Sequence, residues 1–381
     1  MTRVDVAIVG GGPAGLAAAT ELRRRGAGTV VVHEREQHPG GIPRHTTHLG
    51  YGMRDLRRIT TGPRYAAALV RRAEKAGVEI LTGSTVTSID QLDAAAVVLA
   101  TGVRERPRSA RLVPGDRPSG VLTTGALQQF TSLHHQRVGA RAVVVGAEHV
   151  SFSAVLTLRH AGCEVAAMVT PLPRHQTYRA LSFATAGRHR VPVRTGVDVA
   201  EVVGRGRVEG VVLTDGSRIE CDTVVFTGDW VPDHELARTG GIPVLADSRS
   251  PVVDAAMHTE RPGVFAIGNL VHPAETADVC ALDGRHVAPA VLDWLALQRW
   301  PHAVPPISVD PPLRWASHTS RGITLRVDAF TTGRLRVTAA GHELWVGHRR
   351  RFVPNRSITI TDVAVRRATG NDLRIELERQ S

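Results

Sequence analysis

The sequence predicts an α/β fold with a small all-β domain at its C-terminal end. A glycine-rich loop joins an apolar strand to a helix near the start of the chain, and a related pattern recurs at residues 142–151. Apolar residues then alternate with period 2 after a proline-rich segment. The 381 residues are enough for two or three domains.

The first glycine motif lies between a strand at residues 4–9 and a helix at residues 16–25. Its spacing is G-x-G-x-x-G, with Gly10 at the tight turn, Gly12 where a pyrophosphate approaches the backbone, and Gly15 where the helix packs on the strand. The helix N-terminus at Pro13 and Ala14 offers amides and a positive dipole end to phosphates. We therefore expect a dinucleotide to bind here.

A second apolar strand follows at residues 29–33 and ends at Glu34. An acid at this distance from the glycines typically accepts hydrogen bonds from an adenosine ribose. Two further buried strands end in Ala100-Thr101-Gly102 and in Gly268-Asn269. The first glycine motif alone does not distinguish FAD binding from NAD binding, so the identity of the cofactor depends on these later strands.

Taken in order, the three motifs resemble the two-dinucleotide-binding-domain flavoproteins, the glutathione-reductase-like superfamily. The resemblance implies FAD and two nested Rossmann-like dinucleotide-binding domains, each an FAD/NAD(P)-binding three-layer ββα unit. The family has aspartate where this chain has Asn269, and an amide can still hydrogen-bond a ribityl hydroxyl. The resemblance implies cofactor binding by Gly10, Gly12, Pro13, Ala14, Gly15, Glu34, Arg35, Gly41, Ala100, Thr101, Gly102, Gly268, Asn269, Thr276 and Ala277.

The second glycine motif, where the family binds NAD(P)H, is altered. Gly146 is kept, but Glu148 and Ser151 stand in place of the second and third glycines. A glutamate there brings bulk and negative charge to the place of a pyrophosphate. NAD(P)H binding therefore stays possible but doubtful, and Arg174 with His175 are alternative contacts for a 2′-phosphate.

In the disulfide reductases of the family, a Gly-Gly loop presents two cysteines to the flavin. Here the corresponding residues are Pro43 and His48, so disulfide chemistry is excluded at this loop. His48 and His45 are candidates for an acid–base residue, and Arg44 for binding a substrate carboxylate. The alternative is that these side chains only fix the loop. The arginines of residues 48–63 form either a basic mouth to the site or a solvated helix face.

Four features narrow the resemblance to the FAD subunits of sarcosine-oxidase-type, opine-oxidase-type and hydrogen-cyanide-synthase-type complexes: the sequences of residues 40–45, 100–107 and 227–233, and the altered second glycine motif. The favoured function is an FAD-dependent oxidase or dehydrogenase acting on a small amine, amino acid or hydroxy acid, with electrons passing to dioxygen or a partner protein. The alternatives are an NAD(P)H-dependent flavin reductase feeding an external acceptor, and a nucleotide-binding scaffold subunit of a hetero-oligomeric oxidase.

The expected domains are an FAD domain at residues 1–118 and 245–300, an NAD(P)-like domain at 119–244, a proline-rich linker at 301–312 and a β domain at 313–381. The helix before the linker is expected to break or kink near Pro289. About five strands are expected in the β domain, with turns at Gly333, Gly341 and Asn371.

Composition limits the other function classes. The net charge is +11, but the arginines are dispersed and aromatic residues make up only 4%, which argues against nucleic-acid binding. No apolar run is long enough to span a membrane, and no leader peptide is evident, so a cytoplasmic location is expected. Three widely spaced cysteines provide neither a disulfide framework nor a metal site, and we expect them to be buried. A small-molecule substrate is expected, with a partner subunit, an acceptor protein and oligomerisation left open.

Overall fold

The computed structural model describes residues 4–362, 365 and 372–379. The chain divides into two compact units, which are described separately. Unit 1 comprises residues 1–44, 49–103 and 231–381, and unit 2 comprises residues 45–48 and 104–230. Strands β7 (Val103–Glu105) and β16 (Trp230–Pro232) mark two of the places where the chain passes from one unit to the other.

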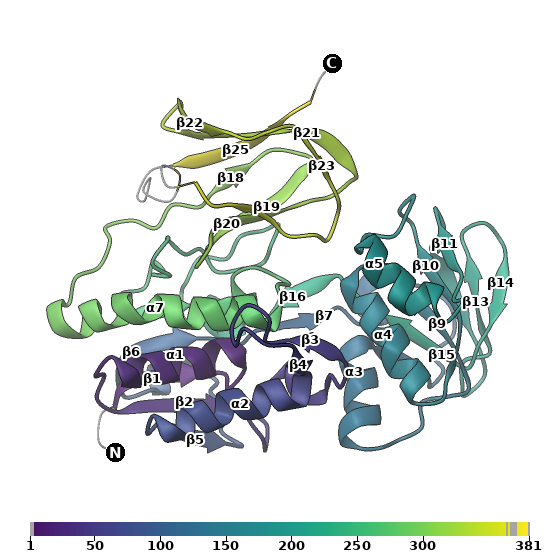
Figure 1. Cartoon of the computed structure of the whole chain (residues 1–381), viewed down its shortest axis with the longest axis horizontal. Helices are drawn as coiled ribbons and strands as arrows, with labels where there is room; N and C mark the ends of the chain where they lie inside the picture. The colour runs from purple at the N-terminus through teal and green to yellow at the C-terminus, as the bar shows by residue number, and fades with distance from the viewer. Residues whose placement is uncertain (1–3, 363–364, 366–371, 380–381) are drawn as a thin grey trace. The chain divides into compact units, whose positions relative to one another are not determined.

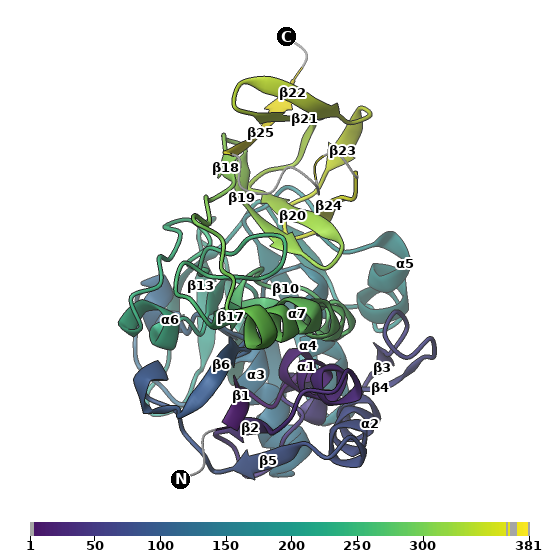
Figure 2. The same cartoon turned by 90° about the vertical axis from the view of Figure 1, so that its left-hand side faces the viewer.

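The centre of unit 1 is a five-stranded parallel sheet in the order β17-β6-β1-β2-β5 (Figure 2). Its strands are β1 (Val4–Val9), β2 (Val30–Glu34), β5 (Glu79–Thr82), β6 (Ala94–Leu99) and β17 (Val264–Ala266). The central strands are apolar over most of their length because both faces of a parallel sheet are covered. The strands predicted at the start of the chain are therefore confirmed.

The helices of unit 1 include α1 (Pro13–Arg24), α2 (Gly62–Lys75), α6 (Glu235–Thr239) and α7 (Ala277–Leu297). Helices α1 and α7 lie side by side (Figures 1 and 2). They approach closely at Gly284, where a Cβ would lie 2.2 Å from the carbonyl oxygen of Ala14. Small residues are therefore required at this helix crossing.

Two predictions for unit 1 are wrong. The break expected near Pro289 does not occur: helix α7 continues through it, because a proline removes a single helical hydrogen bond while the buried residues Val287 and Val291 hold both flanking turns in the core. The expected helix face after His48 is instead the hairpin of β3 (Leu49–Tyr51) and β4 (Thr60–Thr61). The glycines at positions 50 and 52 have positive φ, which favours a turn over a helix.

Unit 2 is a three-layer ββα domain. Its parallel sheet has the order β11-β10-β9-β15-β8, and a separate antiparallel sheet has the order β12-β13-β14. Neighbouring residues of β9 point to opposite cores: Ala142 and Val144 pack with helix α4, while Val143 and Val145 pack with the antiparallel sheet. The elements of this unit are β8 (Val121–Thr123), α3 (Thr124–Gln128), β9 (Arg141–Val145), α4 (His149–His160), β10 (Glu164–Thr170), α5 (Arg179–Ser182), β11 (Val193–Thr195), β12 (Val199–Val203), β13 (Gly210–Leu213), β14 (Arg218–Glu220) and β15 (Thr223–Phe226).

The C-terminal region is a domain rich in β-strands with its own apolar core, including Ile323, Val337 and Ile375. One sheet has the order β18-β25-β21-β22, with β23 also pairing with β21, and another has the order β19-β20-β24. The strands are β18 (Ser308–Val309), β19 (Leu313–Thr319), β20 (Gly322–Val327), β21 (Thr331–Ala339), β22 (His342–Val346), β23 (Arg350–Phe352), β24 (Ile358–Ile360) and β25 (Leu373–Glu378).

The five alternating segments predicted here are confirmed, but the expectation of about five strands is too low. Strands β18 and β23 are too short to show alternation, and buried polar residues such as Ser317 and His318 interrupt the pattern of β19. The turn predicted at Gly333 is also wrong. That residue lies inside β21, where a Cβ would sit 2.4 Å from the carbonyl oxygen of Glu378. Asn371 lies outside the described residues.

Candidate cofactor and active site

The glycine loop between β1 and α1 has the geometry expected of a dinucleotide cradle. Gly10 has φ +109°, and a Cβ there would lie 2.4 Å from the carbonyl oxygen of Ala100. A Cβ on Gly15 would lie 2.0 Å from the carbonyl oxygen of Gly10. By contrast, a Cβ on Gly12 would meet nothing nearer than Gly41, 4.0 Å away. Two glycines thus serve packing, while the third leaves open backbone where a phosphate group fits.

Glu34, at the end of β2, is buried beneath this loop. Its carboxylate accepts hydrogen bonds from the amide of Gly11 at 2.9 Å and from the amide of Glu36 at 2.9 Å. Each carboxylate oxygen has a second lone pair, so Glu34 retains capacity for ribose hydroxyls. The fixed carboxylate and the open glycine backbone fit FAD. Arg35 points away into a salt bridge with Asp233 at 3.1 Å, and its side chain is 65% exposed.

Three further glycines that were predicted to contact the cofactor lie in unit 1. Gly41 has φ +60°, and a Cβ there would lie 3.0 Å from the Cα of Gly12. Gly102 has φ +81° and open space around it, whereas Gly268 (φ +68°) packs against Ala14. The Gly-Gly loop and the ends of β6 and β17 therefore gather beside the first cradle, within unit 1.

Three more residues predicted to contact the cofactor form hydrogen bonds or helix ends within unit 1. Thr101 donates through Oγ1 to the carbonyl of Asp233 at 2.7 Å. Thr276 is the N-cap of α7, and the carbonyl of Ala277 accepts a hydrogen bond from the hydroxyl of Tyr65 at 3.4 Å. Their contacts with FAD stay predictions.

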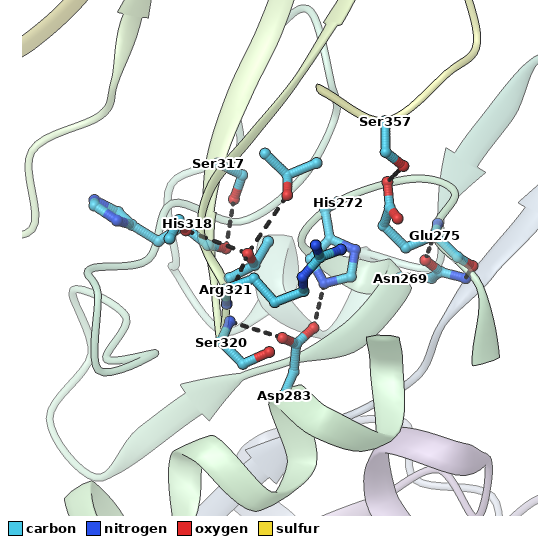
Figure 3. Close-up of polar contacts among 12 residues, drawn as sticks. Asn269, His272, Glu275, Asp283, Ser317, His318, Ser320, Arg321 and Ser357 are labelled. Atoms are coloured by element: carbon cyan, nitrogen blue, oxygen red, sulfur yellow. Dashed lines mark hydrogen bonds and ion pairs between the residues drawn. The ribbon is translucent and has the colours of Figure 1, made fainter. Parts of the chain in front are cut away.

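Asn269 has a role that the sequence did not indicate. Its Nδ2 donates to the carbonyl of Glu275 at 3.1 Å, and its Oδ1 accepts from the amide of the same residue at 2.6 Å (Figure 3). An aspartate could accept the second of these bonds but could not, as an anion, donate the first. The amide therefore closes the loop between β17 and α7, which explains why asparagine replaces the acid here.

Two buried charge pairs adjoin this loop and were missed from the sequence. His272 Nε2 bonds to Asp283, whose other oxygen accepts from the amide of Ser320 at 2.8 Å (Figure 3). Arg326, on β20, forms an ion pair with Glu275, and both side chains are over 90% buried. The partners in the second pair are 51 residues apart, so no local pattern reveals them.

The electrostatics of these pairs favour the charged forms of His272 and Glu275. Burial disfavours the imidazolium of His272, but the Asp283 carboxylate outweighs burial and raises the pKa of His272. Burial likewise disfavours ionised Glu275, yet Arg326 and His272 lower its pKa overall. The C-terminal β domain thus bonds to the loop next to the first cradle through buried ionic groups.

The second cradle is the loop of the second glycine motif, at residues 146–151 in unit 2, and the side chain of Glu148 fills it. Glu148 is the N-cap of α4 and is 6% exposed. Its carboxylate accepts from the amide of Ser151, and the Ser151 hydroxyl accepts from the amide of Glu148 at 3.2 Å. The Ser151 hydroxyl also lies 2.6 Å from Thr227 Oγ1. The two residues that replace the glycines therefore form a reciprocal cap over the helix N-terminus.

A second buried carboxyl group increases the negative character of this cradle. Glu105 is 8% exposed and accepts from the amide of Gly125 at 2.9 Å. Burial raises the pKa of Glu105 to about 7, and the nearby Glu148 carboxylate contributes to that rise. Arg111 binds the carbonyls of Thr227 and Gly228, so its guanidinium is committed to backbone.

The three candidate catalytic residues fall in two different units. Arg44, in unit 1, forms an ion pair with Glu36 and donates to the carbonyl of His38 at 2.6 Å, which favours its alternative role of fixing the loop. His45 and His48 belong to unit 2. His45 is buried, whereas His48 is partly exposed and its Nε2 lies 2.7 Å from Ser153 Oγ.

Residues that the sequence did not single out hold this histidine loop. The amide of Gln128 donates to Ser153 Oγ at 3.0 Å, and Gln128 Oε1 accepts from Thr46 at 3.1 Å. His48 is therefore the end of a polar chain that runs through α3 and α4. The predicted contacts of His48 and His45 with the flavin stay predictions.

The cysteines have no part in either cradle's chemistry. All three are buried free thiols, and burial raises the pKa of Cys163 and of Cys221 to about 11. Within the described residues, no group of three or more histidine, cysteine or acidic side chains is placed to hold a metal ion. No helix in that same part of the chain is long and apolar enough to cross a bilayer.

Residues 4–303 match the family described as pyridine nucleotide-disulphide oxidoreductase. The chain belongs to this family. As a member it is an FAD-dependent oxidoreductase, and the resemblance inferred from the sequence is confirmed.

Similar proteins include reductases and an oxidase subunit. The ferredoxin–NADP reductase of Salinispora tropica is 30% identical over 71% of this chain and 87% of its own. The benzene 1,2-dioxygenase system ferredoxin–NAD(+) reductase subunit of Pseudomonas putida is 29% identical over 70% of this chain and 66% of its own. Sarcosine oxidase subunit alpha of Corynebacterium sp. (strain P-1) is 26% identical over 91% of this chain, which spans 40% of that relative.

Solved structures agree on the fold. Thioredoxin reductase of T. acidophilum matches with a TM-score of 0.63 and 21% identity, covering 76% of this chain and 98% of its own. L-proline dehydrogenase of P. horikoshii matches with a TM-score of 0.58 and 20% identity, and the match covers 77% of this chain and 56% of the dehydrogenase chain. At these identities the likeness concerns architecture alone.

Proposed function

We propose that this protein is an FAD-dependent dehydrogenase or oxidase whose electrons come from an organic substrate. When bound, FAD supplies the hydride acceptor for a small amine, amino acid or hydroxy acid, and the electrons leave to dioxygen or to a partner protein. The observation that carries this proposal is the carboxylate of Glu148 at the N-terminus of α4.

That carboxylate opposes NAD(P)H in two ways. It takes up the α4 amide that a pyrophosphate would use, and its negative charge repels the phosphates, with Glu105 buried nearby. The carboxylate and the backbone amide of Glu148 are both held, because each forms a hydrogen bond with Ser151. Reduction by a pyridine nucleotide in the usual pose is therefore disfavoured, and an organic substrate is the remaining electron source.

The other side chains of the chain fit this chemistry. The three cysteines are buried thiols in separate parts of the fold, so a dithiol relay has no support. His48 is the proposed proton acceptor, because its imidazole is partly exposed and oriented by Ser153. Arg44 serves the loop rather than the substrate, since Glu36 and the His38 carbonyl already bind its guanidinium.

A second candidate is an NAD(P)H-dependent reductase that passes electrons to an external acceptor. The relatives named as ferredoxin reductases, at 29% and 30% identity, favour this function more than the first. In that case NAD(P)H would have to displace Glu148 from the α4 amides, or bind beside it.

Anaerobic stopped-flow absorption of the flavin separates the two. The holoenzyme is mixed with NADH, with NADPH, and with a panel of small amines, amino acids and hydroxy acids. We expect slow bleaching by both nucleotides and rapid bleaching by one member of the panel. Rapid reduction of the wild-type flavin by micromolar NADH or NADPH would establish the second candidate instead.

Variants of Glu148 identify the cause of any slow reaction with nucleotide. Glu148→Gly removes bulk and charge and should speed reduction by NADH or NADPH, while Glu148→Gln keeps the bulk and removes only the charge. Loss of the helix cap should cost about 1 kcal/mol of stability, so both variants remain folded. If Glu148→Gly reacts with neither nucleotide any faster than the wild type, the carboxylate is not the obstacle.

A further inference from the structure

The hairpin that follows the Gly-Gly loop exposes an unusual set of side chains. We call residues 49–61 the arginine hairpin; its strands are β3 and β4, which lie beside α2 (Figure 1). Of the ten large apolar side chains exposed in the described residues, three belong to it: Leu49 is 66% exposed, Met53 54% and Ile59 65%. Such clustering of exposed apolar residues is typical of an interaction surface.

The charge of the hairpin is one-sided. Arg54, Arg57 and Arg58 are exposed, and none of them forms an ion pair with an acid among the described residues. The single acid of the hairpin, Asp55, has a fully buried side chain that binds Arg285 and the hydroxyl of Tyr65. The outer surface of the hairpin therefore presents only positive charge.

The hairpin is held in one conformation from beneath. Burial raises the pKa of Asp278, in the first turn of α7, and the backbone amides of Gly52, Arg54 and Asp55 act in the opposite direction, so these amides face its carboxyl group. The carbonyl of Gly52 accepts from the amides of Leu56 and Arg58 at 3.0 and 3.1 Å. These bonds fix the backbone without covering its outer side chains, so the surface is ordered before any partner arrives.

Its place in unit 1 adjoins the first cradle. Asp278 lies two residues after Thr276, the N-cap of α7, and Tyr65 bonds to both Asp55 and the carbonyl of Ala277. A protein seated on the hairpin would therefore sit over the helix start that we expect to face the cofactor.

We propose that the arginine hairpin is the docking surface for an acidic protein that accepts electrons from the reduced flavin. The exposed apolar side chains of the hairpin, together with its arginines, match a partner that presents apolar residues next to carboxylates. The transfer would take two electrons from one reduced FAD, release one proton, and reduce two one-electron carriers. The role of acceptor rests on the proposed function, whereas the recognition of an acidic face does not.

The test measures binding of the oxidised holoenzyme to an acidic [2Fe–2S] ferredoxin by isothermal titration calorimetry, with no substrate present. The triple variant Arg54→Gln/Arg57→Gln/Arg58→Gln should raise Kd about tenfold and flatten its dependence on salt. Met53→Ser/Ile59→Ser should also raise Kd but leave the salt dependence unchanged. The matched control is Arg71→Gln/Arg72→Gln/Lys75→Gln on α2, which removes the same charge from exposed positions of the same unit.

Several outcomes would overturn the proposal. One is an equal loss of affinity in the α2 control, which would show a general charge effect. Another is equal affinity for a basic cytochrome c. A third is binding to vesicles of phosphatidylglycerol and phosphatidylcholine without binding to the ferredoxin, which would assign the hairpin to a membrane surface. Because the measurement needs no turnover, a failure to find an organic substrate would not affect it.

Discussion

The replacement of Asn269 by aspartate, the acid that the family carries at this point, separates two roles for the residue. In the structure its amide bonds to both the carbonyl and the amide of Glu275. Asn269→Asp loses the donor and places a negative charge against a carbonyl oxygen that lies 3.1 Å away. Breaking one such partly buried bond and leaving the carbonyl unpaired should lower the free energy of unfolding by about 1–3 kcal/mol.

Urea unfolding followed by tryptophan fluorescence measures this loss, with Asn269→Ala as the uncharged comparison. The loss should shrink at acidic pH, because the introduced carboxyl group, once protonated, regains a donor for the Glu275 carbonyl. The affinity for FAD, measured by flavin fluorescence, should not rise in the aspartate variant. An aspartate variant as stable as the wild type at neutral pH, with tighter FAD binding, would refute the loop-closing role and restore the predicted ribityl contact.

Two further predictions concern unit 2. His48→Ala should slow flavin reduction by the organic substrate about 100-fold or more while FAD stays bound, because a proton acceptor typically contributes ~10²–10⁴-fold to the rate. Stopped-flow absorption measures this rate. An unchanged rate would show that His48 takes no part in the reaction. Glu105→Gln should raise the free energy of unfolding at pH 8 and make that free energy less dependent on pH. Burial raises the pKa of Glu105 from 4.5 to about 7. The protonated carboxyl group therefore contributes stability that is fully present below pH 4.5 and is lost as pH rises through 7. That rise in pKa corresponds to about 3 kcal/mol, measurable by urea unfolding at pH 5 and pH 8, and identical pH profiles for variant and wild type would contradict it.

The sequence predicted the parts of the fold that depend on local pattern. Gly10, Gly12 and Gly15 indicated the first cradle because their spacing is a local pattern, and the packing of Gly15 against Gly10 and of Gly10 against Ala100 agrees. Alternation in the C-terminal region likewise predicted strands such as β20 and β25. Pro289 misled because tertiary packing outweighs the loss of one helical hydrogen bond.

The site was predictable only in part. The altered residues Glu148 and Ser151 signalled a changed cradle, and their reciprocal bonds supply the reason. Arg326 and Glu275, or Asp283 and the amide of Ser320, meet across 51 and 37 residues, and no spacing rule connects them. Arg44 looked available to a substrate because its partner Glu36 is an ordinary loop residue in the sequence.

The buried ion pairs of the C-terminal domain have a consequence for how this protein can be divided. A chain cut at the proline-rich linker would lose Arg326 and the Ser320 amide, stranding the carboxylate of Glu275 and one oxygen of Asp283 at a freshly opened surface. Water would solvate these carboxylates, but the bonds that join Glu275 and Asp283 to the C-terminal domain would be lost. The C-terminal domain thus helps to order the loop between β17 and α7, and a shortened chain should hold that loop less firmly.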